Sequence, residues 1–253
     1  MCAWTVVIDP AHEPPPVPKR AGEIEGSEAA GIVLAPIDSG DEGRADYAGP
    51  LLSDIRFADF SKSALVRIAD EVCLQQHLLT LGFMVAVRES ASGTADGNAE
   101  LVVDIARKQF TGIAGLTSER LRRVLALGTD SAALAQILRC HPAWNPLPYS
   151  DIDITAERDT VVLRLRRDCP GVRDGGWPAL LDADHLAPLN AMARGVNPHF
   201  DARVRAADDA EIVFEIAATP TAFREMPEVA ITRFSTGAEF TFAERRSLPL
   251  TVV

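Results

Sequence analysis

Lysine, paired cysteines and long apolar runs are all scarce in this sequence. The only lysines are Lys19, Lys62 and Lys108, and the acidic side chains bring the formal net charge to −11. Phosphate backbones and anionic lipids repel a protein of this charge, so we expect neither a nucleic-acid partner nor a membrane partner. No apolar run reaches the roughly 18 residues that a membrane-spanning helix needs.

The cysteines and the first residues bear on the compartment. Cys2, Cys73, Cys140 and Cys169 share no Cys-x-x-Cys spacing, which argues against a disulfide framework. Residues 1–9 lack the basic region and the long apolar stretch of a secretory signal. We therefore expect a cytoplasmic protein.

The common catalytic and nucleotide-binding motifs are missing as well. No lysine follows a glycine, which excludes a P-loop. The sequence also lacks G-x-G-x-x-G, G-x-S-x-G and H-E-x-x-H, so the usual dinucleotide, serine-hydrolase and zinc-protease interpretations lose their support. We expect no cofactor.

What is present predicts an α+β protein. Apolar residues make up 47% of the chain and charged residues 24%, which is a globular balance. Residues 1–50, rich in proline and acidic side chains, should form a mostly flexible arm with short apolar docking segments, one of them at 31–37. Residues 51–253 should form a single domain, with a helical part at 51–145 and a sheet part at 146–253. Helices gathered before a mostly antiparallel sheet favour α+β over a doubly wound fold.

The strongest periodic segment is 61–88, which predicts one long helix capped by Ser61 or Ser63. Apolar residues lie nearly all round it, so we expect it to be buried and to support the other elements. Shorter helices are predicted at 98–110, 117–127 and 130–140, and one further helix between Asp182 and Gly195. Alternation predicts strands at 151–155, 160–166, 200–206, 210–217 and 229–234, with weaker candidates at 239–242 and 248–253.

Glu71 is the leading candidate for a functional side chain. Glu71 and Gln75 lie one turn apart in an apolar stripe of the long helix, where an unpaired carboxylate would be costly. In one interpretation an arginine pairs with it, the candidates being Arg107, Arg120 and Arg122. In the other, Glu71 lies in a pocket with a raised pKa and acts as a general acid or base or anchors a ligand. Asp70 and His77 form a second polar pair, more typical of a solvated face.

Histidines and tryptophans supply the remaining candidates. His199, at a turn into a strand, is the second candidate for general acid–base catalysis. A zinc site or a Cys–His nucleophile pair could be drawn from Cys140, His141, His185 and His199, but the spacing gives no support and we predict no metal. His141 is better explained as an imidazolium at a helix end. Trp144 and Trp177, beside prolines, can line a ligand mouth or cover the core.

Two hypotheses about function follow. The first is a non-catalytic module that binds a small, partly apolar molecule or a protein partner, as a regulator, sensor or assembly subunit, with Glu71, Gln75, Trp144 and Trp177 as candidate ligand-binding residues. The second is a metal-independent enzyme that acts on a small, partly apolar substrate through Glu71 or His199. Fold class does not choose between them. A homo-oligomer is compatible with either, since Ile32, Val33 and Leu34 and any unpaired sheet edge favour self-association.

Overall fold

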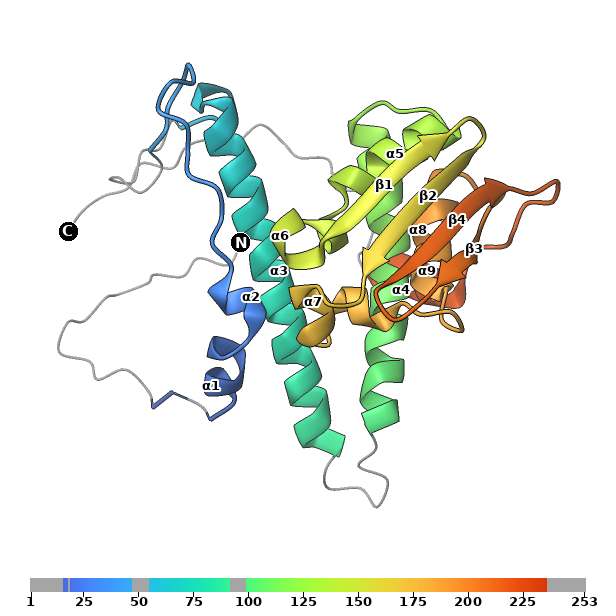
Figure 1. The fold of residues 1–253 in the computed structure, drawn as a ribbon, viewed down its shortest axis with the longest axis horizontal. Helices are drawn as coiled ribbons and strands as arrows, with labels where there is room; N and C mark the ends of the chain where they lie inside the picture. The colour runs from blue at the N-terminus through green and yellow to red at the C-terminus, as the bar shows by residue number, and fades with distance from the viewer. Residues whose placement is uncertain (1–15, 18, 47–54, 92–98, 236–253) are drawn as a thin grey trace, which may run out of the picture.

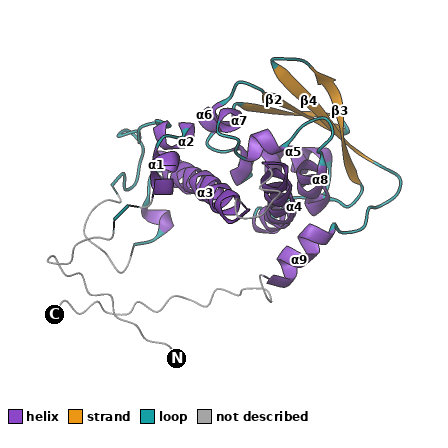
Figure 2. Cartoon of the chain, turned by 90° about the horizontal axis from the view of Figure 1, so that it is seen from below, coloured by secondary structure: helices purple, strands orange, loops and turns teal. Residues whose placement is uncertain are grey.

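The computed structural model describes residues 16–17, 19–46, 55–91 and 99–235, and these form an α+β fold. The antiparallel sheet has the order β1-β2-β4-β3. The longer helices α4, α5 and α8 lie on one side of it, and no described helix covers the other side (Figure 2). The α+β class predicted from the sequence is confirmed. Within the described ranges no helix is both long and apolar enough to cross a membrane.

The strands form where alternation predicts them. β1 (Ile152–Glu157) and β2 (Thr160–Arg166) make the first hairpin, and β3 (Phe200–Ala207) and β4 (Glu211–Ala218) make the second. Across the sheet Ile154 faces Leu163, Leu163 faces Phe214, and Phe214 faces Val204. This row lies in the main core. The period of two in these segments therefore reflects one face packed against helices.

Two long helices run side by side (Figure 1). α3 (Lys62–Ala91) confirms the predicted long helix, and the Ser61 hydroxyl accepts a hydrogen bond from the Ala64 amide at 3.2 Å as its cap. Its expected burial needs correcting, because only one side is buried. Val72 and Leu79 are 60% and 62% exposed. The sheet and its covering helices pack around α4 (Ala99–Val124) instead, and α3 flanks that core.

The shorter helices connect these elements and close the core. They are α5 (Ser131–Cys140), α6 (Leu147–Ser150), α7 (Pro170–Arg173) and α8 (Ala187–Val196), with the 3-10 turns η1 (Phe57–Asp59), η2 (Pro142–Trp144) and η3 (Trp177–Leu180). Asp130 caps α5 as expected, accepting from the Ala133 amide at 2.8 Å. α8 begins at Ala187 rather than beside Asp182 or Asp184.

Part of the predicted arm is helical and docked. α1 (Lys19–Glu25) and α2 (Glu28–Gly31) pack against α3 and α7. The Asp174 carboxylate accepts hydrogen bonds from the Glu28 and Ala29 amides at 2.8 and 2.9 Å, which anchors the start of α2. Residues 32–37 form no strand. They run beside α3, where Arg67 donates to the carbonyls of Leu34 and Ala35. The division of the chain into arm and domain stays a prediction.

The predicted strand at 229–234 is wrong. This segment belongs to α9 (Pro227–Ser235), which lies against α4. Pro227 and Glu228 stand in its first turn, where the fixed φ of proline and a negative charge both favour helix initiation. α9 then packs against the surface of α4 at Gly112 and Gly115. The weaker strand candidates at 239–242 and 248–253 lie outside the described residues.

Candidate functional site

Glu71 does not occupy the buried, unpaired position that an acid–base role requires. Its carboxylate pairs with Arg67 at 2.8 Å, one turn earlier in α3, and its side chain is 41% exposed. An arginine partner was expected, but Arg67 takes the place of Arg107, Arg120 and Arg122. Gln75 is exposed. Glu71 and Gln75 border neither of the two cavities described below.

Trp144 and Trp177 lie in the core rather than at a ligand mouth. Their exposed fractions are 0% and 2%. Phe110 stacks on Trp177 with ring centroids 4.9 Å apart and meets Trp144 edge-on at 6.3 Å. His77 extends this aromatic cluster, with its ring 5.5 Å from that of Trp177. The tryptophans thus join α4 to η2 and η3.

His77 and His141 are buried and structural. The Nε2 atom of His77 lies 2.9 Å from the carbonyl oxygen of Asn145, and burial lowers the pKa of His77 to about 4. His141 accepts from the Ala143 amide through Nδ1 and contacts the Ala114 carbonyl through Nε2. Burial also lowers the pKa of His141 to about 4. The expected imidazolium at this helix end is therefore a neutral ring.

The candidate metal ligands do not meet. Within the described ranges no three His, Cys, Asp or Glu side chains are grouped so that they could hold a metal ion. Cys140 is exposed, whereas the neighbouring His141 points into the core. His199 donates through Nδ1 to the Thr219 carbonyl at 2.9 Å, which ties the start of β3 to the loop after β4.

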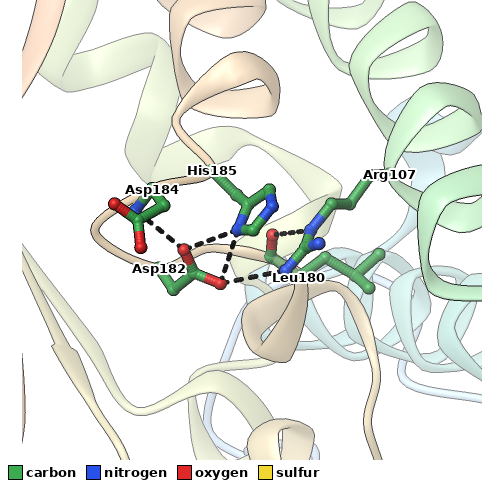
Figure 3. A network of polar contacts seen from close by, with 5 residues as sticks. All are labelled: Arg107, Leu180, Asp182, Asp184 and His185. Atoms are coloured by element: carbon green, nitrogen blue, oxygen red, sulfur yellow. Dashed lines mark hydrogen bonds and ion pairs between the residues drawn. The ribbon is translucent and has the colours of Figure 1, made fainter. Parts of the chain in front are cut away.

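His185 belongs to a polar network that the sequence analysis did not single out (Figure 3). Its Nδ1 lies 2.7 and 2.8 Å from the two carboxylate oxygens of Asp182. Arg107, on α4, reaches the same carboxylate at 2.9 Å and the Leu180 carbonyl at 3.1 Å. The hydrogen bonds from His185 and from the Asp184 amide help to lower the pKa of Asp182, although burial opposes them. The network fastens the loop before α8 to α4, and it borders neither cavity.

A cavity of about 330 Å³ lies between α4, α8, α9 and the loop 223–226. Its apolar floor comes from Ala191, Val196, Met226 and Val229. The helices approach closely because glycines face one another. A side-chain carbon at Gly195 would lie 2.3 Å from the Gly115 carbonyl, and one at Gly112 would lie 2.1 Å from the Thr232 hydroxyl. The volume matches the lower end of small-molecule sites.

The charges around this cavity are mostly guanidinium groups. Its lining includes Arg122, Arg194, Arg224 and Arg233 against only two carboxylates, Glu119 and Glu225. Arg233 pairs with both carboxylates at 2.7 Å, and their hydrogen bonds raise the pKa of Arg233. In a chain of net charge −11, the lining of this cavity thus carries more guanidinium groups than carboxylates.

Of the other three arginines of the cavity, one pairs with a carboxylate, and the other two make no ion pair within the described ranges. Arg194 binds Asp201 at 2.6 Å and lies 3.7 Å over the ring of Phe223. Arg122 carries a buried Nε that has no hydrogen-bond partner among the described residues. Arg224 is exposed and makes no ion pair within the described ranges. Arg122 and Arg224 are thus the two arginines of the lining that make no ion pair within the described ranges.

Sequence reasoning missed this cavity. Its arginines are spread over residues 122–233, and α9, which forms one wall, was predicted as a strand. The available signal was Gly112-Ile-Ala-Gly115, a pair of small residues on one helix that permits close helix contact. No known protein assists the assignment, since no family model, curated protein or solved structure matches this chain.

The second cavity, also of about 330 Å³, lies where residues 35–41 cross the start of α3. Lys62, Arg67, Asp38, Asp41 and Asp70 line it. Its polar groups largely satisfy one another. Asp41 accepts from the Ser63 amide at 2.8 Å, and hydrogen bonds from Ser63 lower the pKa of Asp41. Arg67 is held by Glu71 and by backbone carbonyls. This cavity therefore offers a ligand less than the first one does.

Proposed function

We propose that the protein is a non-catalytic binding module for a small organic anion with an apolar portion, held in the cavity between α4, α8 and α9. The observation that carries the proposal is the pair Arg122 and Arg224, which line the cavity without a carboxylate partner among the described residues. A buried guanidinium nitrogen needs an acceptor, and a ligand carboxylate or phosphate supplies one. The apolar floor would receive the rest of the molecule.

The lining of the cavity has an apolar part and a charged part. Val196 and Val229 are buried, at 3% and 7% exposure, and give an apolar surface. The cation–π contact with Phe223 and the ion pair with Asp201 hold the charged side chain of Arg194 in place in the same lining. A ligand with one charged end and a short hydrocarbon or aromatic body fits both parts. This chemistry agrees with the partly apolar ligand expected from the sequence.

The experiment uses octanoate and benzoate as probes, with benzyl alcohol as the uncharged comparison, and measures binding by NMR shift titration of the full chain. We expect both carboxylates to bind, and benzyl alcohol to bind at least tenfold more weakly, since a hydrogen bond to a charged group contributes about 1.5–3 kcal/mol. Arg122→Met and Arg224→Met, which keep an unbranched stem, should each weaken carboxylate binding by about tenfold or more.

Arg120→Met is the matched control, because Arg120 is an exposed arginine of α4 that does not line the cavity. It should leave the affinity for octanoate unchanged. Equal binding of benzoate and benzyl alcohol, or equal binding by the native chain and both cavity variants, would contradict the proposal.

The enzymatic alternative through Glu71 or His199 stays a prediction with less support. Glu71 is ion-paired and half-exposed, and Nδ1 of His199 is committed to the Thr219 carbonyl. His199 stands next to Pro198, which lines the cavity, yet it is not itself part of the lining. A protein partner, the other form of the binding hypothesis, also stays a prediction.

A further inference from the structure

Residues 224–235 form one wall of the cavity between α4, α8 and α9, and we call them the C-terminal wall. α9 lies on the side of α4 and α8 that faces away from the sheet (Figure 2). The wall contributes to the lining Arg224, Glu225, Met226, Val229 and Arg233. The rest of the lining belongs to α4, α8 and the residues Pro198 and Phe223. The cavity therefore exists only while the C-terminal wall lies against these two helices.

The C-terminal wall is attached to the fold by few buried contacts. Val229, at 7% exposure, is the only residue of α9 that is buried. It packs with Leu116, Ala191 and Met226 in a small apolar cluster that is separate from the main core. Residues 220–225 are exposed and contain neither helix nor strand. A segment with so little buried apolar surface opens at a lower free energy than the core does.

Phe223, which directly precedes the C-terminal wall, is fixed to the rest of the fold. Its amide donates to the Pro198 carbonyl at 2.8 Å, and the guanidinium of Arg194 lies 3.7 Å from the centre of its ring. Arg194 is in turn paired with Asp201 at the start of β3. Helix α9 begins only at Pro227. Residues 224–226 therefore lie between an anchored residue and a helix, where the wall can turn without disturbing the sheet.

Each side of the cavity brings one guanidinium group that makes no ion pair within the described ranges. Arg122 belongs to α4, and its buried Nε has no hydrogen-bond partner there. Arg224 belongs to the C-terminal wall. The ion pair that already joins the two sides, Arg233 with Glu119 at 2.7 Å, shares its guanidinium with Glu225 of the wall itself. An anion that accepts hydrogen bonds from Arg122 and Arg224 together would add a second bridge.

We propose that the C-terminal wall opens and closes about residues 224–226, and that the bound anion holds it closed by bridging Arg122 and Arg224. The inference rests on the proposed function and adds that occupancy of the cavity controls the docking of α9. A ligand that binds only the closed form makes the open form rarer, by about one hundredfold at a ligand concentration one hundred times Kd. The binding module thus reports the ligand concentration through the docking of α9.

The experiment is hydrogen exchange on the full chain, without octanoate and with octanoate at about one hundred times the Kd that the NMR titration gives. The reporter is the Ala230 amide, which donates to the Met226 carbonyl at 3.0 Å. Without ligand it should exchange at least about tenfold faster than the amides of β2, because the wall opens while the sheet stays folded. Octanoate should slow it by up to about one hundredfold. The Ala29 amide, held by Asp174 at 2.9 Å on α2, is the control and should keep its rate.

Arg224→Met tests the bridge. With octanoate again at about one hundred times its Kd for this variant, the slowing of Ala230 should be about tenfold smaller, because the carboxylate then contacts α4 alone. Arg120→Met, the matched control outside the lining, should show the native slowing. Binding of octanoate without a change at Ala230, native slowing in Arg224→Met, or exchange of Ala230 no faster than that of β2 would each overturn the inference and leave the proposed function standing. Absence of octanoate binding would overturn both.

Discussion

Acid should destabilise this protein through two buried histidines, and His141 makes the case most directly. Its ring is 1% exposed, Nδ1 accepts from the Ala143 amide at 3.2 Å, and Nε2 contacts the Ala114 carbonyl. Burial lowers its pKa from the usual 6.5 to about 4. The unfolded chain therefore binds a proton between pH 6.5 and 4 that the folded chain does not bind, so stability is lost as the pH falls through this window.

The magnitude follows from the two pKa values. The difference between 6.5 and about 4 corresponds to about 3 kcal/mol once the pH is well below 4. At pH 4.5 most of this, about 2 kcal/mol, should already be lost relative to pH 7. His77 has the same lowered pKa of about 4, with burial as the main cause. Hydrogen bonds to the Asn145 and Pro142 carbonyls, and the charge of Asp174, oppose the lowering of the His77 pKa. The two histidines together should remove about 4–5 kcal/mol at pH 4.5.

Urea denaturation at several pH values between 7 and 4.5 provides the assay. Each histidine contributes about 1.4 kcal/mol per pH unit to the slope of unfolding free energy against pH within the window. His141→Gln and His77→Gln should each remove one such contribution, and the double variant should remove both. The carboxylates titrate equally in all four proteins and cancel in the comparison. If both single variants kept the native slope, the burial argument would be refuted.

Two further predictions concern the packing of α9 and the anchoring of α2. Gly112→Ala should lower the free energy of unfolding by about 1–3 kcal/mol and increase proteolysis within residues 227–235, because the new methyl group would lie 2.1 Å from the Thr232 hydroxyl and 2.7 Å from the Glu228 carbonyl. Gly82→Ala, a helical position with nothing within 4 Å, should instead stabilise by up to about 1 kcal/mol, and the reverse order would contradict the packing model. Asp174→Ala removes the acceptor for the Glu28 and Ala29 amides and should speed hydrogen exchange of α2 while leaving the sheet protected. Unchanged exchange at both amides would show that α2 does not depend on this carboxylate.

Local patterns predicted the hairpins and most of the helices because their causes are local. The alternation in 160–166 and 210–217 corresponds to one packed face, and Asp130 and Ser61 act as caps within three residues of the amides they bind. The failures have tertiary causes. Residues 229–234 include the β-branched Val229, Ile231 and Thr232 and still form a helix, because Gly112 and Gly115 leave room on α4 for α9 to pack closely. The two helices predicted at 98–110 and 117–127 are one continuous helix, α4, which runs through Gly112 and Gly115.

The candidate site was less predictable than the fold. Periodicity places Glu71 in an apolar stripe, but it does not say which side of α3 another element will cover, and Arg67, one turn away, supplies the partner. Trp144 and Trp177 were undecided between core and ligand mouth, and the stacking on Phe110 resolves this in favour of the core. The cavity depends on arginines separated by as many as 111 positions, from Arg122 to Arg233, which only the packing of α9 brings together.

The glycine contacts between α4, α8 and α9 set the distance between these helices, whereas other side chains supply the polar groups of the cavity. Where helices meet main chain to main chain, as at Gly115 and Gly195, their spacing does not depend on the bulk of other side chains. Arg122, Arg224 and Met226 line the cavity beside these contacts. If the proposed function holds, exchange of these lining residues should change ligand preference while the glycine contacts keep the helix spacing, which makes the cavity a suitable starting point for engineering altered selectivity.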